Sequence, residues 1–163
     1  MQKAFINHSN NIKVIRNGFT YIGLLIVIAI AGIGMAAVGV LWKTEMQREH
    51  EKELLFIGHE FIEAIVSYYN ATPSGVKQLP KTLDNLITDQ RLPIIKHHLR
   101  KLYIDPMTGK ADWGLILHKG TIVGVYSLSD VKPLKTHGFE VGQEGFATAK
   151  SYRDWQFTYS AGI

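Results

Sequence analysis

The chain has 163 residues, the length of one ordinary domain, and its lack of cysteine excludes disulfides, thiolate zinc sites and cysteine nucleophiles. Its formal net charge is +4, but Lys3, Lys13 and Arg16 lie in the first 18 residues, where there is no Asp or Glu. Without these three, 15 basic and 14 acidic residues remain, so most of the excess positive charge lies in the N-terminal 18 residues. The rest of the chain is near neutral, which indicates no general affinity for nucleic acid.

An uncharged run of 26 residues extends from Asn17 to Trp42, bounded by Arg16 and Lys43. About 20 apolar helical residues, at roughly 1.5 Å each, cross a hydrocarbon core of about 30 Å. The run therefore predicts a membrane-spanning helix over residues 19–42. Because Lys and Arg favour the cytoplasmic side, the chain after Lys43 is expected outside the cytoplasm.

A secretory signal peptide has the same general form but fits this run less well. The apolar stretch exceeds the usual length of about 7 to 15 residues for a signal core. It also lacks a small-x-small cleavage site followed by a polar mature start. A plain single-pass membrane anchor remains an alternative.

The junction before the apolar run reads R-N-G-F-T-Y-I-G-L-L, from Arg16 to Leu25. It resembles the processing site of type IV prepilins and type II secretion pseudopilins, in which a prepilin peptidase cuts after the Gly and methylates the new N-terminal Phe. The resemblance implies cleavage between Gly18 and Phe19, with residues 1–18 as a basic leader peptide. A glycine lets the chain bend into a protease cleft without a side-chain clash.

One position departs from that family, which usually has Glu at the fifth mature position, where this chain has Gly23. In the family the carboxylate is assigned to a pair with a neighbour's terminal amine, and its absence is associated with the subunit that starts the filament tip. A charge in the bilayer is costly unless it is paired. Gly23 therefore removes the contact that would align neighbouring subunits, and it also avoids the cost of desolvating a carboxylate. A specialised filament position and simple divergence are both open.

Small residues mark the second half of the apolar run, with Gly32 and Ala36 at a small-xxx-small spacing. Such spacing lets helices approach closely where lipid provides no hydrophobic drive. We expect Gly23, Gly32 and Ala36 to pack in a filament core, although membrane helices are in any case rich in Gly.

Beyond Trp42 the sequence predicts one continuous helix that ends near Asn70, before the breakers at residues 72–75. Its apolar residues recur at the spacing of an amphipathic helix: Leu54, Ile57, Phe61, Ile65 and Tyr68. A helix with one apolar face needs a sheet to cover that face.

The downstream segments predict an α+β fold, pilin-like, with the long N-terminal helix packed on a small antiparallel β-sheet in an extracytoplasmic domain of residues 43–163. The expected elements are helices at 82–88 and 93–102, a turn-rich stretch at 104–113, hairpin strands at 113–117 and 121–127, and a final strand at 155–159. Three stretches also resemble ones that recur in proteins identified as pseudopilins: Leu79–Leu86, Asp105–Trp113 and Gly124–Ser129.

No motif predicts an enzyme. His59, Glu60 and Glu63 form H-E-x-x-E, in which a carboxylate replaces the second histidine of a zinc-protease helix, so they are interpreted as a charged helix flank. A hydrolytic triad can be written from Ser127, Ser129, His137 and Asp154, but no nucleophile-elbow pattern surrounds either serine.

Calcium is the one cofactor hypothesis that the sequence leaves open. Asp105, Asp112 and Asp130 lie in expected loops, and carboxylate oxygens suit that ion. With Pro106 and Gly109 nearby, Asp105 is more simply a turn former, so no cofactor is expected.

A basic cluster of residues 97–101 could contact phosphate, as in DNA-uptake pili. Only Tyr103 accompanies it as an aromatic platform, so a solvated helix face is favoured and nucleic acid is not expected as a partner.

Together these patterns predict a pseudopilin of a type II secretion system. It would be cleaved by a prepilin peptidase and held in the bacterial inner membrane, with a cytoplasmic N-terminus and a periplasmic C-terminal domain. It would then join other pseudopilins on an inner-membrane assembly platform to form a periplasmic pseudopilus. The alternatives are a minor type IV or DNA-uptake pilin, and a single-pass binding protein that never polymerises.

Overall fold

The computed structural model describes residues 18–72 and 76–159, without the side chains at 18, 19, 33–38, 40 and 41. It divides into two compact units, Met1–Trp42 and Lys43–Ile163. The expected leader lies outside the described residues, except for Gly18.

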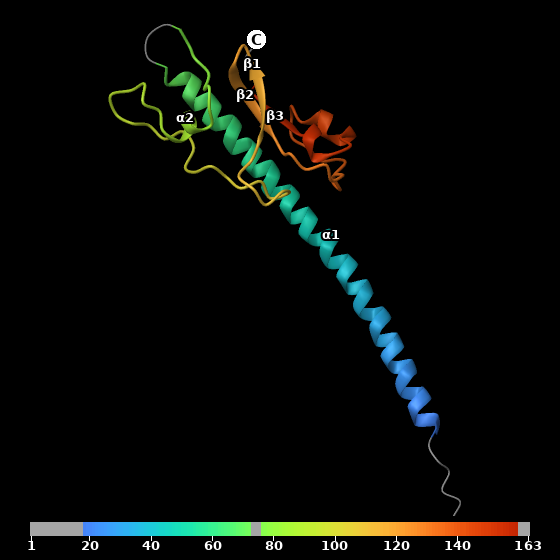
Figure 1. Ribbon diagram of the computed structural model, residues 1–163. Coiled ribbons are helices and arrows are strands. Elements are labelled where there is room, and N and C mark those ends of the chain that lie inside the picture. The colour runs from blue at the N-terminus through green and yellow to red at the C-terminus, as the bar shows by residue number, and fades with distance from the viewer. Residues whose placement is uncertain (1–17, 73–75, 160–163) are drawn as a thin grey trace, which may run out of the picture. The chain divides into compact units, whose positions relative to one another are not determined.

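The fold is α+β, with one long helix and a three-stranded antiparallel sheet, as predicted (Figure 1). Its elements in chain order are α1 (Gly18–Asn70), α2 (Asp84–Ile87), β1 (Gly114–His118), β2 (Thr121–Tyr126), the 3₁₀ turns η1 (Glu144–Thr148) and η2 (Tyr152–Asp154), and β3 (Gln156–Thr158).

The second half of α1 buries the face that the sequence predicted. All five apolar residues of that face are buried: Leu54, Ile57, Phe61, Ile65 and Tyr68. The helix ends at Asn70, also as predicted, and the Ala71 amide still donates to the Ser67 carbonyl. The period of 3.6 residues per turn keeps these side chains on one stripe, which becomes the centre of the core.

The sheet has the order β1-β2-β3, and each neighbouring pair is antiparallel. Lys119 and Gly120 join β1 to β2, with φ angles of 49° and 80°. Positive φ at both positions makes a type I′ turn, whose twist matches that of the strands it connects. A bulge between Ile116 and Leu117 shifts the register of β1 against β2.

Helix α1 and strand β3 meet at Gly58. A Cβ atom at that position would overlap the ring of Phe157, which points from the middle of β3. Glycine in a helix interior costs up to about 1 kcal/mol relative to alanine. Here the missing side chain makes room for the buried ring of Phe157, and this packing explains why glycine occupies a helix interior despite its lower helix propensity.

The predicted helix at residues 93–102 is wrong. This segment is irregular, and its backbone bonds go to other parts of the chain: Asp89 and Lys96 form an isolated bridge, and the amides of His98 and Leu99 both donate to the Leu86 carbonyl. The helix expected at 82–88 exists but is shorter, Asp84–Ile87. Pairing with α2 and its neighbours replaces the hydrogen bonds that a helix would have made within the segment.

An aromatic cluster at the C-terminal end was not predicted. The rings of Phe146 and Trp155 stack 5.5 Å apart, and Phe139, Tyr152 and Phe157 meet this pair edge-on. Trp155 belongs to this cluster, and the last strand is Gln156–Thr158, one residue shorter at each end than the expected 155–159. Edge-to-face and offset ring pairs add to the free energy of burial.

Candidate functional site

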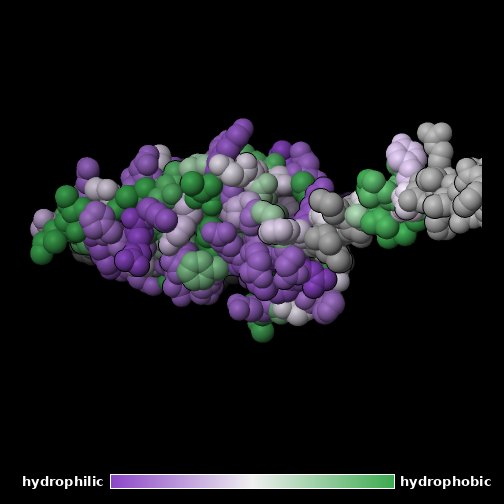
Figure 2. All heavy atoms as spheres, turned by 90° about the horizontal axis from the view of Figure 1, so that it is seen from below, coloured by the Kyte–Doolittle hydropathy of each residue, from purple (hydrophilic) through white to green (hydrophobic). Residues whose placement is uncertain are grey.

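The N-terminal stretch of α1 exposes apolar side chains on every side. Eight large hydrophobic residues between Tyr21 and Ile30 have exposed fractions of 47% to 65%. Since successive helical residues are about 100° apart, they surround the helix completely. Figure 2 shows hydrophobic colouring on this stretch, whereas hydrophilic side chains cover most of the visible face of the Lys43–Ile163 unit.

Within the part of the chain whose side chains are described, no helix combines the length and hydropathy of a membrane span. The predicted span, residues 19–42, also includes side chains at 19, 33–38, 40 and 41, which lie outside that description.

The residues expected to form the filament core lie along this stretch of α1. A Cβ atom added to Gly23 or Gly32 would meet no atom within 4 Å, so both positions are open surface. The side chains of Phe19 and Ala36 lie outside the described residues. Gly18, at the expected cleavage site, is the first residue of α1.

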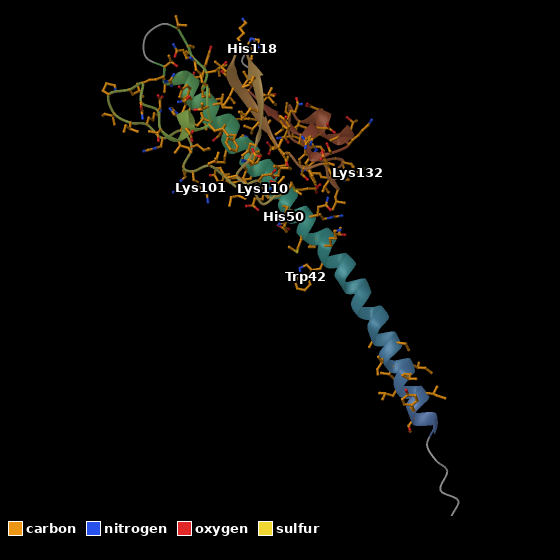
Figure 3. All side chains as sticks on the ribbon, viewed as in Figure 1. Trp42, His50, Lys101, Lys110, His118 and Lys132 are labelled. Carbon is orange, nitrogen blue, oxygen red and sulfur yellow. The ribbon has the colours of Figure 1, made fainter. Side chains whose placement is uncertain are left out.

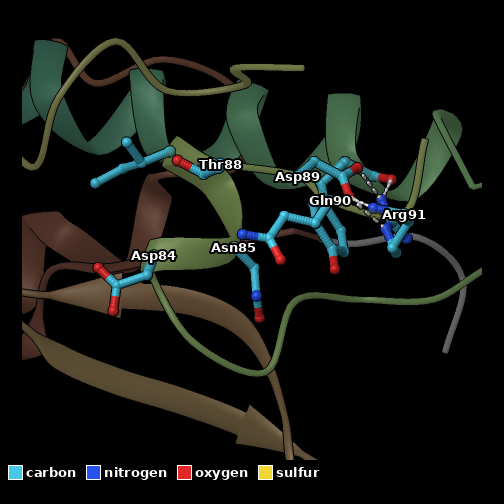
Figure 4. Close-up of a pocket in the computed structure, with 8 residues that line it drawn as sticks. Asp84, Asn85, Thr88, Asp89, Gln90 and Arg91 are labelled. Atoms are coloured by element: carbon cyan, nitrogen blue, oxygen red, sulfur yellow. Dashed lines mark hydrogen bonds and ion pairs between the residues drawn. The ribbon is translucent and has the colours of Figure 1, made fainter. Parts of the chain in front are cut away.

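In the other unit, a partly buried salt bridge ties an irregular loop to the end of α1 (Figure 4). The Arg91 guanidinium donates to both Asp89 oxygens, at 2.8 and 2.6 Å, and to the Tyr68 carbonyl at 2.9 Å. It also stacks on the Tyr68 ring, 3.4 Å from the centroid. Hydrogen bonds from Arg91 hold the pKa of Asp89 well below its usual range. Arg91 thus caps a carbonyl at the C-terminal end of the helix, where a cation is favourable.

His98 joins this salt bridge to a serine of α1. Its Nε2 lies 3.2 Å from Asp89 Oδ2 and its Nδ1 lies 2.8 Å from Ser67 Oγ. Burial lowers the pKa of His98, which keeps the ring neutral. A neutral ring donates from Nε2 to the carboxylate and accepts at Nδ1 from the Ser67 hydroxyl.

Ser67, His98 and Asp89 therefore lie in the order of a catalytic triad, but their surroundings favour a structural role. Arg91 already occupies both oxygens of Asp89, and the His98 side chain is fully buried. The neighbouring cavity of about 410 Å³ is lined by Asp89 and Arg91 but not by Ser67 or His98. A nucleophile needs access to its substrate, so this arrangement connects segments of the fold and predicts no hydrolysis.

A second buried carboxylate, Glu51 of α1, holds the loop after β2. It accepts hydrogen bonds from the amides of Leu134 and Lys135, at 2.6 and 3.1 Å, and from the Tyr152 hydroxyl at 2.9 Å. Glu51 is only 3% exposed. One turn earlier, Gln47 donates to the same hydroxyl at 2.8 Å. The helix thereby fixes two segments that lie more than 80 residues away along the chain.

A third buried carboxylate, Asp105, links the turn-rich stretch to the end of β2. It accepts from the Ser127 hydroxyl at 2.7 Å and from the Met107 amide at 2.8 Å. The Ser127 hydroxyl in turn accepts from the Ser129 amide. Two of the stretches that resemble pseudopilins, Asp105–Trp113 and Gly124–Ser129, therefore meet at one buried contact.

The structure does not bring the candidate calcium ligands together. Asp105 is buried against Ser127, Asp112 is exposed, and Asp130 pairs with Arg153 at 2.5 Å. Across residues 18–72 and 76–159, no group of three or more His, Cys, Asp or Glu side chains is placed to hold a metal ion.

The other candidate sets have surface or capping roles in the structure. His59 pairs with Glu63 at 3.2 Å on the exposed flank of α1. In the triad written from the sequence, His137 contacts Thr136, and Asp154 caps η2 by accepting from the Lys150 and Ser151 amides.

No protein-family model, curated protein or solved structure matches the chain. Sequence reasoning missed Glu51 and Asp89 as buried residues, since charged residues in a polar helix stretch and a loop carry no local signal of burial. The three buried carboxylates, Glu51, Asp89 and Asp105, are each hydrogen-bonded to other residues of the fold. The exposed apolar stretch of α1, by contrast, has no packing partner within the described residues of the fold.

Proposed function

We propose that the protein is a pseudopilin of a type II secretion system, made as a precursor, cleaved between Gly18 and Phe19, and assembled into a periplasmic pseudopilus. The basic leader and the R-N-G-F-T-Y junction support the processing step. The other pseudopilins, the prepilin peptidase and an inner-membrane assembly platform would be its partners.

The observation that carries this proposal is the exposed apolar stretch that begins just after the expected cleavage site. Large apolar side chains from Tyr21 to Ile30 surround α1, whereas Leu54 to Tyr68 of the same helix belong to a packed core. Contiguous exposed apolar surface on this scale marks a membrane or protein contact. In the proposed function this stretch is covered by lipid before assembly and by the same stretch of neighbouring subunits afterwards.

The decisive experiment is the intact mass of the full precursor, purified from membranes with and without a prepilin peptidase. With the peptidase, a chain that starts at N-methylated Phe19 is expected. Gly18→Val should block the cut by placing a branched side chain in the protease cleft, while Gly23→Ala, a matched small change beyond the site, should be processed normally.

The same measurement distinguishes the alternatives. A chain that still starts at Met1 with active peptidase would identify a plain membrane anchor, and a start beyond residue 42 would identify a signal peptide. A chain that is processed but forms no crosslinked assemblies would leave only the binding-protein alternative.

Polymerisation can be tested by cysteine crosslinking, because the chain has no native cysteine. Single cysteines at Ile26 and Ile30, which are 54% and 64% exposed, should give disulfide-linked dimers only when the subunit assembles. A cysteine at Lys132, on the other unit, is the matched control for random collision. Co-assembly with secretion or with type IV pilus components then separates the two kinds of filament.

A further inference from the structure

A cleft at one end of the sheet is lined by residues from four parts of the chain and has a volume of about 530 Å³. It lies entirely within the Lys43–Ile163 unit. Its walls come from the end of α1, the segment after it, the β1–β2 turn and the residue after β3: Tyr69, Lys77, Gln78, Leu79, Lys81, His118, Lys119, Thr121 and Tyr159.

The cleft gathers positive charge without a counter-charge. Three lysines, Lys77, Lys81 and Lys119, line it beside His118, and none of its lining residues is acidic. The salt bridges formed among residues 18–72 and 76–159 do not involve any of these lysines. Lys77 is partly accounted for, since it donates to Asn70 Oδ1 at 2.9 Å near the end of the helix. The side chains of Lys81, Lys119 and His118 form no hydrogen bond with the other described residues.

Two features of the β1–β2 turn are costly for the fold alone. The His118 Nε2 atom is buried and has no hydrogen-bond partner among the described residues. Lys119 has φ of 49° in a type I′ turn, where Asn, Asp or Gly is favoured and other residues are strained. A buried polar atom without a partner and a strained residue in the same turn call for a functional explanation.

The cleft also has an apolar wall. The rings of Tyr69 and Tyr159 lie 5.7 Å apart at a tilt of 55°, and Leu79 lines the same space. Its volume exceeds what one inorganic anion would fill. A ligand with both a compact charged group and an organic body would match both parts of the cleft.

We propose that this cleft binds a phosphomonoester, with its phosphoryl group at Lys81, Lys119 and His118 and its organic body against Tyr69, Tyr159 and Leu79. Lysine binds phosphate as a point charge, and a turn of the His118 ring toward the cleft would give its covered Nε2 atom the hydrogen-bond partner that it lacks. A carboxylate carries half the charge of a phosphate dianion and would leave more of the positive charge unmatched.

A second lysine-lined cleft gives the comparison. Lys132, Lys135 and Lys150 line a cavity of about 400 Å³, but neither an unpartnered buried nitrogen nor a positive φ outside glycine occurs among the described residues there. Figure 3 shows Lys132 well away from His118. Lys150→Glu therefore makes the same charge change as Lys81→Glu at a site that lacks the other features.

The test is calorimetric titration of the full chain in detergent with glucose 6-phosphate, inorganic phosphate and glucose, followed in parallel by the NMR shifts of the His118 ring. Glucose 6-phosphate should bind most tightly, inorganic phosphate more weakly and glucose not at all. Lys81→Glu should weaken the binding of glucose 6-phosphate by at least about tenfold, since a lost charge-assisted hydrogen bond is worth about 1.5 kcal/mol or more. Lys150→Glu should leave the affinity unchanged.

Lys119→Gly separates binding from folding. Glycine accepts positive φ without strain, so the variant should bind more weakly while its melting temperature stays the same or rises. Absence of heat and of His118 shifts with both phosphates, or equal loss in Lys81→Glu and Lys150→Glu, would overturn the proposal. Equal affinities for inorganic phosphate and glucose 6-phosphate would assign the site to the free anion and overturn the role of the organic body. None of these outcomes depends on processing or polymerisation.

Discussion

At the scale of single residues, Gly58 is the point where α1 accepts a ring of the sheet. In an unobstructed helix, Gly→Ala would stabilise by up to about 1 kcal/mol. At Gly58 the new methyl group would overlap the ring of Phe157, so Gly58→Ala should instead destabilise the fold by about 1 to 3 kcal/mol. Chemical denaturation measures the change. Gly145→Ala, where a Cβ meets nothing within 4 Å, is the control, and equal effects of the two would contradict the close approach.

Glu51 gives a second prediction at the residue scale. Its carboxylate is the acceptor for three donors, so Glu51→Leu would leave two partly buried amides and a buried hydroxyl without it. We expect a loss of about 2 kcal/mol in the free energy of unfolding, because the buried hydroxyl loses an acceptor and water replaces the carboxylate only partly at the two amides. The same substitution at the exposed Glu53 should change stability by less than about 0.5 kcal/mol. A comparable loss at both positions would show that helix charge, and not the buried contact, is being measured.

At the scale of elements, the Asp89–Arg91–His98 group joins the irregular segment after α2 to the end of α1, and two of its members titrate. Burial lowers the pKa of His98, so as pH falls through about 6.5 the unfolded chain binds this proton first and stability decreases. The contribution of the neutral His98 ring to the free energy of unfolding is fully present above that pH range. Bonds from Arg91 lower the pKa of Asp89, so its contribution is present above about pH 4 and is lost in more acidic solution.

The pH prediction is therefore that the free energy of unfolding falls between pH 7.5 and 5.5, and that His98→Gln flattens this slope. The charged groups acting on His98 are Asp89, Arg91 and Lys96, and all three remain in the variant. Denaturant titrations at each pH give the slope. His137→Gln, at an exposed ring, should keep the slope of the parent chain. A slope in His98→Gln as steep as in the parent would mean that another group titrates.

At the scale of the whole molecule, the open question is the subunit's place in the proposed filament, and Gly23 is the residue that addresses it. A Cβ atom there meets nothing within 4 Å, so a longer side chain fits without disturbing α1. If the missing carboxylate marks a tip subunit, Gly23→Glu should change the number and length of filaments counted by electron microscopy. Gly23→Gln, with the same shape and no charge, should not. Unchanged filaments with Gly23→Glu would leave divergence as the explanation.

The sequence alone predicted the features that depend on neighbouring residues. The extent of α1 to Asn70 and its buried face follow from a helical period and from the breakers after it. The β1–β2 hairpin follows from Lys119-Gly120 between two apolar runs. The junction at Gly18 and the apolar stretch after it are likewise local patterns, and they carry the proposed function.

Only the tertiary structure decided which polar residues are buried and which local preferences fail. Glu51 meets Leu134 across 83 positions of sequence, and Asp105 meets Ser127 across 22. The segment at 93–102 has an acceptable helical pattern, yet its amides pair with Leu86 and Asp89 instead. These outcomes depend on contacts between segments far apart in the chain. A local pattern records the propensity of a segment but not the partner that will satisfy its hydrogen bonds.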